Sequence, residues 1–236
     1  MPLESAKFVR FEGGKPTSVC VGQLWKGKKV VVFALPGAFT PTCTTSHLPR
    51  YEELYETFRE QGVDEVYCVS MNDDFVMKAW FEKLGVNNIK SIPDGNGEVS
   101  KALGIWMSRE ELGFGPRARR SSFLINDLKI EKSFIESETP GDPFEVSGAE
   151  NMLHFINPDA QIPKPITVFG THACSYCIKT KKLLEEKRLK YVFVELSPSE
   201  KSIVIGALNQ GASTTPQIFI DGKCIGGYTE LAALLQ

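Results

Sequence analysis

The chain has 236 residues, enough for one large domain or two modest ones. Hydrophobic residues make up 42% of the chain and charged residues 24%, as in an ordinary globular protein. The formal net charge of -2 at pH 7 gives no electrostatic reason to expect a nucleic-acid or membrane partner, and we predict neither. No segment approaches the ~20 apolar residues of a membrane span, and the N-terminus lacks an apolar core of signal-peptide length. We therefore expect a cytoplasmic protein.

Strand and helix patterns alternate along residues 1–156, which predicts an α/β unit with a mixed sheet flanked by helices. The first helix has apolar residues at three- and four-residue spacing. Strands are expected at 30–35, 65–70, 119–126 and 129–136. Helices are expected at 44–61, 73–85 and 148–156.

Residues 157–165 carry three prolines and cannot continue a helix, so we interpret them as a linker that spans at most ~30 Å. A second α/β unit is predicted over residues 166–236. Its expected strands are 165–170, 191–196, 216–221 and 223–227, and its expected helices are 175–189, 200–210 and 228–236.

Cys43 lies where the strand 30–35 gives way to the helix 44–61. A helix N-terminus offers unpaired N–H groups and a partial positive charge, which favour the thiolate, the reactive form of cysteine. Thr40 can place a hydroxyl beside the sulfur, and Pro36 can shield the sulfur from bulk water. On these features alone, a buried core cysteine remains the alternative.

The pattern Pro36-x-x-x-Thr40-x-x-Cys43 resembles the active-site signature of peroxiredoxins. The resemblance extends over roughly residues 1–156 and is strongest to the short enzymes with a single peroxidatic cysteine. It implies that Cys43 attacks peroxide and becomes a sulfenic acid. It also implies that Thr40 hydrogen-bonds to sulfur and peroxide, and that Arg120 holds the thiolate and the peroxide oxygen. Arg119 is the neighbour with which Arg120 can be confused.

Three other side chains of this unit bear on the chemistry. His47, one turn after Cys43, is a candidate base, but we expect a surface or helix-packing histidine instead. Cys20 and Cys68 are expected to be buried fillers. A thiol outside this unit must then reduce the sulfenic acid.

Cys174 and Cys177 form a Cys-x-x-Cys pair at the start of the helix 175–189. After a strand, this spacing indicates thiol–disulfide chemistry, with Cys174 exposed at the helix N-terminus and Cys177 one turn inside. Zinc bound by these two with His172 and Cys224 is an alternative. The paired spacing of a zinc module is missing, so no metal is predicted and Cys224 is expected to pack.

Residues 166–236 resemble glutaredoxins in three separate motifs, Cys-Ser-Tyr-Cys at 174–177, Thr-Pro-Gln at 215–217 and Gly-Gly-Tyr-Thr-Glu-Leu at 226–231. The resemblance implies a cis peptide bond before Pro216, and backbone N–H groups of Tyr228 and Thr229 that bind the γ-glutamyl carboxylate of glutathione. Thr171 stands where many glutaredoxins have lysine, so the anchor for the glycine carboxylate stays open. The implied glutathione-binding residues are Tyr176, Thr215, Pro216, Gly227, Tyr228 and Thr229.

The whole chain resembles the bacterial peroxiredoxin–glutaredoxin fusion proteins, which implies two thioredoxin-like domains at 1–156 and 166–236. The implied activity is glutathione-dependent reduction of hydrogen peroxide and small alkyl hydroperoxides, with no bound cofactor. Oxidised Cys43 would be reduced by glutathione through Cys174, within a chain or between subunits of a homo-oligomer (dimer or tetramer). A peroxide-responsive redox sensor and a module that binds an Fe–S cluster stay open as alternatives.

Overall fold

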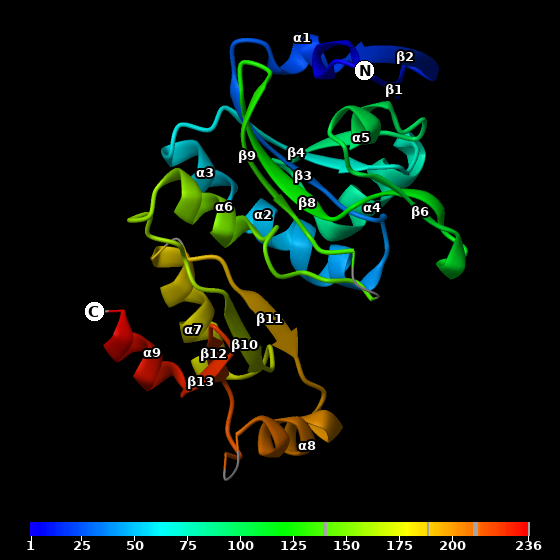
Figure 1. The fold of residues 1–236 in the computed structure, drawn as a ribbon. Coiled ribbons are helices and arrows are strands. Elements are labelled where there is room, and N and C mark those ends of the chain that lie inside the picture. The colour runs from blue at the N-terminus through cyan, green and yellow to red at the C-terminus, as the bar shows by residue number, and fades with distance from the viewer. Residues whose placement is uncertain (139–140, 188, 210–211, 236) are drawn as a thin grey trace. The chain divides into compact units, whose positions relative to one another are not determined.

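A computed structural model describes residues 1–138, 141–187, 189–209 and 212–235. The chain divides into two compact units, Met1–Ile162 and Pro163–Gln236, and each is described by itself (Figure 1). The domain limits expected from the sequence stay a prediction. Arg188, Gln210 and Gln236, which belong to predicted helices, lie outside the described residues.

The first unit is built on a mixed sheet with strand order β5-β4-β3-β8-β9. The strands β3, β4 and β5 run parallel, whereas β8 and β9 are antiparallel to their neighbours. The mixed sheet predicted from the sequence is therefore confirmed. The strands are β3 (Lys29–Ala34), β4 (Glu65–Ser70), β5 (Lys90–Pro93), β8 (Ser121–Asn126) and β9 (Lys129–Ile135).

The central strand β3 is buried on both faces. Val31 and Phe33 belong to one hydrophobic core, and Val30, Val32 and Ala34 belong to the core on the opposite face. Successive side chains of a strand point to opposite faces of the sheet. A strand with a core on each side therefore has a continuous apolar sequence, as residues 30–35 do.

Helices pack against the sheet of the first unit (Figure 1). The core that contains Phe33 includes side chains of α2 (Leu48–Glu53), α3 (Tyr55–Glu60), α4 (Asp74–Leu84) and α6 (Ala149–Ile156). The opposite core includes side chains of α1 (Val21–Trp25) and α5 (Glu98–Ala102). The hairpins are β1 (Lys7–Glu12) with β2 (Lys15–Cys20), and β6 (Trp106–Arg109) with β7 (Gly115–Ala118). Short 3₁₀ turns lie at Leu3–Ser5 and Glu110–Leu112.

The single helix predicted at 44–61 is wrong, because the chain forms three consecutive segments there. A π-helical turn, Cys43–His47, is followed by α2 and then by α3, with Leu54 between them. The N–H of Leu48 bonds to the carbonyl of Cys43, five residues back. Pro49 has no N–H to donate, so regular α-helical bonding cannot run through this point. Single π turns of this kind are frequent at functional sites.

The second unit has its own mixed sheet, with strand order β11-β10-β12-β13. Ile166, Val168, Leu184, Ile218 and Leu231 form its core, so β10, β12, α7 and α9 pack together. The strands are β10 (Ile166–Gly170), β11 (Val192–Glu195), β12 (Gln217–Ile220) and β13 (Lys223–Gly226). The helices are α7 (Ser175–Glu186), α8 (Pro198–Leu208) and α9 (Tyr228–Leu234).

We predict opposite effects for two glycine substitutions in the second unit. A Cβ at Gly170 would lie 2.5 Å from the Cys177 sulfur and 3.2 Å from Phe193, so Gly170→Ala should lower the free energy of unfolding by about 1–3 kcal/mol.

At Gly206, inside α8, a Cβ meets no described atom within 4 Å, so Gly206→Ala should raise the free energy of unfolding by up to about 1 kcal/mol. Native-state hydrogen exchange of β10 and β12 measures both. A neutral Gly170→Ala would contradict the packing described here.

Candidate active sites in the two units

Cys43 begins the π-helical turn that follows the carboxyl end of β3, and its side chain is fully buried. Arg120 Nη1 donates a hydrogen bond to its sulfur, with a separation of 3.4 Å. Arg120 directly precedes β8, whose first residue, Ser121, pairs with Ala34 at the end of β3. The antiparallel register of β3 and β8 thus brings together two residues that are 77 positions apart.

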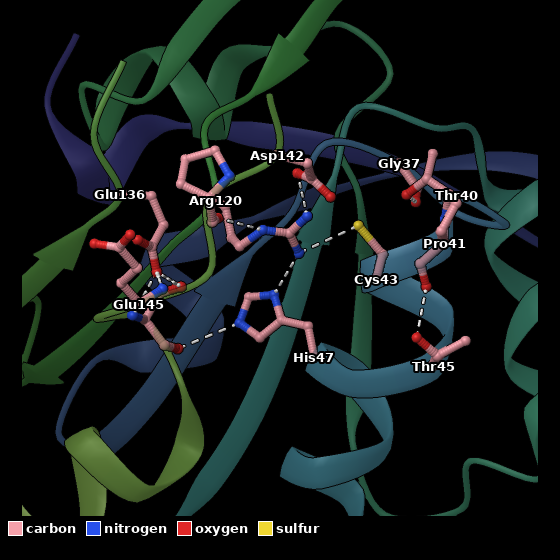
Figure 2. A network of polar contacts seen from close by, with 12 residues as sticks. Gly37, Thr40, Pro41, Cys43, Thr45, His47, Arg120, Glu136, Asp142 and Glu145 are labelled. Atoms are coloured by element: carbon pink, nitrogen blue, oxygen red, sulfur yellow. Dashed lines mark hydrogen bonds and ion pairs between the residues drawn. The ribbon is translucent and has the colours of Figure 1, made fainter. Parts of the chain in front are cut away.

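The Arg120 guanidinium is 2% exposed, and its nitrogens have several partners (Figure 2). Nη1 also lies 3.2 Å from His47 Nδ1, Nε donates to the carbonyl of Pro143 at 3.1 Å, and Nη2 pairs with the carboxylate of Asp142. The ring of Phe144 packs 5.6 Å from the guanidinium carbon. A buried charge is tolerated only when it is paired and hydrogen-bonded. These contacts fix the guanidinium plane with one nitrogen directed at the sulfur.

His47 is fully buried, so a surface position is wrong and the helix-packing alternative is nearer the structure. Its Nε2 lies 3.3 Å from the carbonyl of Ser147, which can only accept. Nε2 therefore carries the proton, and Nδ1 accepts from Arg120. Burial first, and then the charge of Arg120, lower the pKa of His47 to about 3. The His47 ring is neutral, and its Nδ1 lone pair already accepts a hydrogen bond from Arg120. His47 therefore supports the arginine and does not act as a base for the thiol.

The segment 141–148, here called the strap, carries most of the groups that hold Arg120 and His47. Glu136 Oε1 fastens the strap, because it accepts hydrogen bonds of 2.7 to 2.9 Å from the N–H groups of Glu145, Val146 and Ser147 and from the Ser147 hydroxyl. Burial raises the pKa of Glu136, but these hydrogen bonds outweigh it and the pKa is lowered. Sequence reasoning missed the strap and Glu136, because an acceptor for backbone N–H groups leaves no residue pattern.

The loop before Cys43 brings Pro36 and Thr40 to the same site. The Thr40 hydroxyl donates to the carbonyl of Gly37 at 2.8 Å, so its lone pairs remain to accept a hydrogen bond from a ligand (Figure 2). Pro36 and Thr40 line a cavity of about 550 Å³ together with Pro41 and Thr42. The cavity lies against the turn that carries Cys43.

The other cysteines of the first unit differ from each other. Cys68 is fully buried in the core that contains Cys43. Burial, and then the proximity of Cys43, raise the pKa of Cys68 well above its ordinary value, which keeps it a protonated filler as expected. Cys20 is only half-buried and lies 2.9 Å from the Glu4 carbonyl, so its expected full burial is wrong.

In the second unit, Cys174 is the N-cap of α7, and the N–H of Cys177 donates to its sulfur at 3.3 Å. Burial raises the pKa of Cys174, but hydrogen bonds from the Thr215 side chain, Cys177 and Tyr176 outweigh it and lower the pKa. The Cys174 sulfur also lies 3.3 Å from the carbonyl oxygen of Thr215, to which the thiol can donate. Cys177 is almost fully buried, and burial followed by the neighbouring Cys174 raises its pKa to about 11. The pKa values of the two thiols are therefore shifted in opposite directions, and Cys174 is the one that ionises more readily.

The six residues expected to bind glutathione lie around one cavity of about 490 Å³. The peptide bond before Pro216 is cis, as predicted. The ring centroids of Tyr176 and Tyr228, which both line it, are 6.0 Å apart. The residues are Tyr176, Thr215, Pro216, Gly227, Tyr228 and Thr229.

The side chains of the zinc alternative do not gather with the cysteine pair. His172 stacks on Phe193 and pairs with Glu195. Cys224 is exposed and lies 3.6 Å from the Gln217 amide oxygen, so its expected packing role is wrong. Within the part of the chain that the structure describes, no three metal-ligating side chains are grouped.

A redoxin family model matches residues 4–153, and a glutaredoxin family model matches residues 166–225. Over 220 residues the chain is 45% identical to the hybrid peroxiredoxin hyPrx5 of Haemophilus influenzae, covering 93% of this chain and 91% of that protein. The chain belongs to the hybrid peroxiredoxins. This hybrid peroxiredoxin thus joins two thioredoxin-fold domains, and its first unit is a thiol peroxidase.

Other relatives of the hybrid peroxiredoxin match its first unit. A peroxiredoxin of Synechocystis, sll1621, is 49% identical over 154 residues, which are 62% of this chain and 81% of that protein. The crystal structure of reduced Prx3 from Vibrio vulnificus in complex with hydrogen peroxide superposes with a TM-score of 0.61 and 37% identity, covering 66% of this chain and 96% of that one.

Among the described residues, no helix is long and apolar enough to cross a membrane.

The lowered pKa of His47 predicts acid sensitivity of the first unit. Between pH 6.5, its ordinary pKa, and about 3, the unfolded chain binds a proton that the folded chain excludes. The contribution to stability is therefore complete above pH 6.5 and is lost as the pH falls, by up to about 1.4 kcal/mol per pH unit. Denaturant unfolding followed by tryptophan fluorescence isolates this unit, since Trp25, Trp80 and Trp106 all lie in it. His47→Gln should flatten the pH dependence, and an unchanged slope would contradict the assignment.

The two thiols of the second unit should also react differently with an alkylating agent. Iodoacetamide should modify Cys174 first near neutral pH, because its pKa is lowered and its sulfur is accessible, whereas Cys177 is buried with a pKa of about 11. Mass spectrometry of tryptic peptides after short exposure measures the two rates. Comparable modification of both cysteines would show that the division is wrong.

Proposed function

We propose that this hybrid peroxiredoxin is a glutathione-dependent peroxidase for hydrogen peroxide and small alkyl hydroperoxides, with glutathione as co-substrate and no bound cofactor. One observation carries most weight: a desolvated guanidinium, that of Arg120, contacts the sulfur of Cys43 at 3.4 Å. The glutaredoxin-family domain on the same chain supports glutathione as the source of electrons.

In the first step, the Arg120 guanidinium donates a hydrogen bond to the Cys43 sulfur in a site without bulk water. The reactive form of this sulfur is the thiolate. The thiolate attacks one peroxide oxygen, the O–O bond breaks, and the other oxygen leaves as water or alcohol after taking up a proton. The sulfur becomes a sulfenic acid. Thr40 accepts a hydrogen bond from the peroxide hydroxyl, and Arg120 stabilises the charge that develops on oxygen. Pro36 keeps water from the sulfur.

In the second step, glutathione condenses with the sulfenic acid, so that an S–S bond forms and water leaves. The Cys174 thiolate then attacks the glutathionyl sulfur and releases Cys43. The cavity around Thr215 and Tyr228 holds the glutathionyl group during this transfer. A second glutathione, or Cys177 through an internal disulfide, restores Cys174. The raised pKa of Cys177 favours the route through glutathione.

The joining of the two domains gives the reductase site a high effective concentration at the peroxidatic site, on the millimolar scale for a short linker. A linker of nine residues, 157–165, extends at most ~30 Å. We propose that transfer also occurs between subunits of a homo-oligomer, a dimer or a tetramer. The rate per chain would then fall on dilution below the dissociation constant of the oligomer.

A peroxidase assay supplied with glutathione and glutathione reductase tests the proposal. Cys43→Ser should abolish peroxide consumption but keep activity on small glutathione mixed disulfides. Cys174→Ser should lose the activity on mixed disulfides and most glutathione-driven turnover. Cys177→Ser should keep substantial activity.

Cys20→Ser is the matched control, because this thiol lies outside both sites and should leave turnover unchanged. Equal inactivity of Cys177→Ser and Cys174→Ser would refute the glutathione route. Consumption of about one peroxide per chain, with glutathione in excess, would refute the enzyme and indicate a sensor.

A further inference from the structure

We propose that the cavity beside Cys43 is a glutathione-binding site of the first unit, anchored by Arg109 and used before glutathione reacts with oxidised Cys43. This inference rests on the proposed function. One wall of the cavity is the Cys43 loop, with Thr40, Pro41 and Thr42. Another is the arm, residues 109–114, which runs from the last residue of β6 to the start of β7 and contributes Arg109, Glu111, Leu112 and Phe114.

The size of the cavity points to an occupant larger than hydrogen peroxide. Its volume of about 550 Å³ is in the range of small-molecule sites, ~300–1,000 Å³. Hydrogen peroxide needs little more room than a water molecule, which takes ~30 Å³. The cavity therefore has room for either the organic part of a hydroperoxide or a peptide thiol.

The charges on the wall decide between these two occupants. The Arg109 side chain is 19% exposed and forms an ion pair of 3.1 Å with Glu111, whose side chain is 58% exposed. An ion pair with such an exposed carboxylate is weak, so a ligand carboxylate can replace Glu111 on the guanidinium. Glu111 can then accept from an ammonium group, whereas the other carboxylates of the cavity wall, Glu138 and Asp142, are already paired with Arg119 and Arg120. Glutathione carries carboxylates and an ammonium, whereas an alkyl chain carries neither.

Glutathione bound in this cavity would have its thiol near Cys43, the residue that it reduces. Cys43 is fully buried, so its π-helical turn must move before a docked thiol can reach the sulfur. The glutathione sulfur then attacks the sulfenic sulfur, the S–S bond forms, the S–O bond breaks, and hydroxide leaves as water with the thiol proton. No other oxidant or reductant takes part. Arg109 is thus a residue that selects the reductant, and Cys174 acts afterwards on the mixed disulfide.

The test uses the full chain with Cys174→Ser, Cys177→Ser and Cys224→Ser, so that every cysteine left lies in the first unit. Cys43 is oxidised with one equivalent of hydrogen peroxide and mixed with glutathione, or with 2-mercaptoethanol, a thiol without charged groups. Mass spectrometry of quenched samples gives the rate of mixed-disulfide formation. Arg109→Ala should lower the rate constant for glutathione on the order of tenfold, and should change that for 2-mercaptoethanol by less than about twofold.

Lys129→Ala is the matched loss of a positive charge, because the register of β8 and β9 places Lys129 at the end of the sheet away from Cys43. It should leave both rate constants unchanged. A second measurement needs no substitution at Arg109: glutathione with esterified carboxylates should react more slowly than glutathione at equal thiolate concentration.

Equal loss for both thiols would mean that Arg109 only shapes the loop, and no loss for glutathione would mean that it binds elsewhere. Either result overturns the proposed site while glutathione-driven turnover persists. If glutathione does not react with oxidised Cys43 in the chain with Arg109 intact, the proposed function itself fails. The two failures are therefore distinguishable.

Discussion

The burial of the Arg120 guanidinium is the constraint on which the first unit's chemistry depends. A cation removed from water requires a complete set of acceptors, and the fold supplies them from segments far apart in sequence. Asp142 and the Pro143 carbonyl come from the strap, and His47 comes from the π-helical turn. Glu136 accepts hydrogen bonds from backbone N–H groups of the strap. The position of Arg120 Nη1 next to Cys43 therefore depends on the Glu136 carboxylate, which does not contact the sulfur.

The two units position a cysteine in the same way, at the start of a helical segment. In each, a strand ends, a short loop follows, and a cysteine begins a helical segment, Cys43 in the first and Cys174 in the second. In each, a second cysteine is buried with a raised pKa, Cys68 or Cys177. The difference lies in solvent: Cys174 is accessible and stabilised by backbone N–H groups, whereas Cys43 is enclosed and faces a cation. An enclosed sulfur suits a small peroxide, and an accessible one suits a glutathionyl disulfide.

Much of this arrangement was predictable from sequence, because local patterns carry it. The apolar run 30–35 predicts a buried strand, the Cys-x-x-Cys spacing predicts the second site, and both family resemblances are confirmed. The rest depends on long-range contacts. The tautomer of His47 follows from the carbonyl of Ser147, 100 residues away, and its lowered pKa follows from burial and from Arg120. The break in the helix 44–61 follows from Pro49. Short elements such as β5 and α5 have too few residues to show a period.

The most direct measurement of the central claim is the rate constant for oxidation of Cys43 by hydrogen peroxide in the Arg120→Lys chain. Lysine keeps the positive charge but lacks the planar fork that reaches the sulfur, His47 and Asp142 together. If the geometry of the guanidinium activates the thiol, stopped-flow tryptophan fluorescence should show a loss on the order of 100-fold or more relative to the unsubstituted chain. A rate constant within about twofold of the unsubstituted chain would show that Cys43 does not depend on how Arg120 is held.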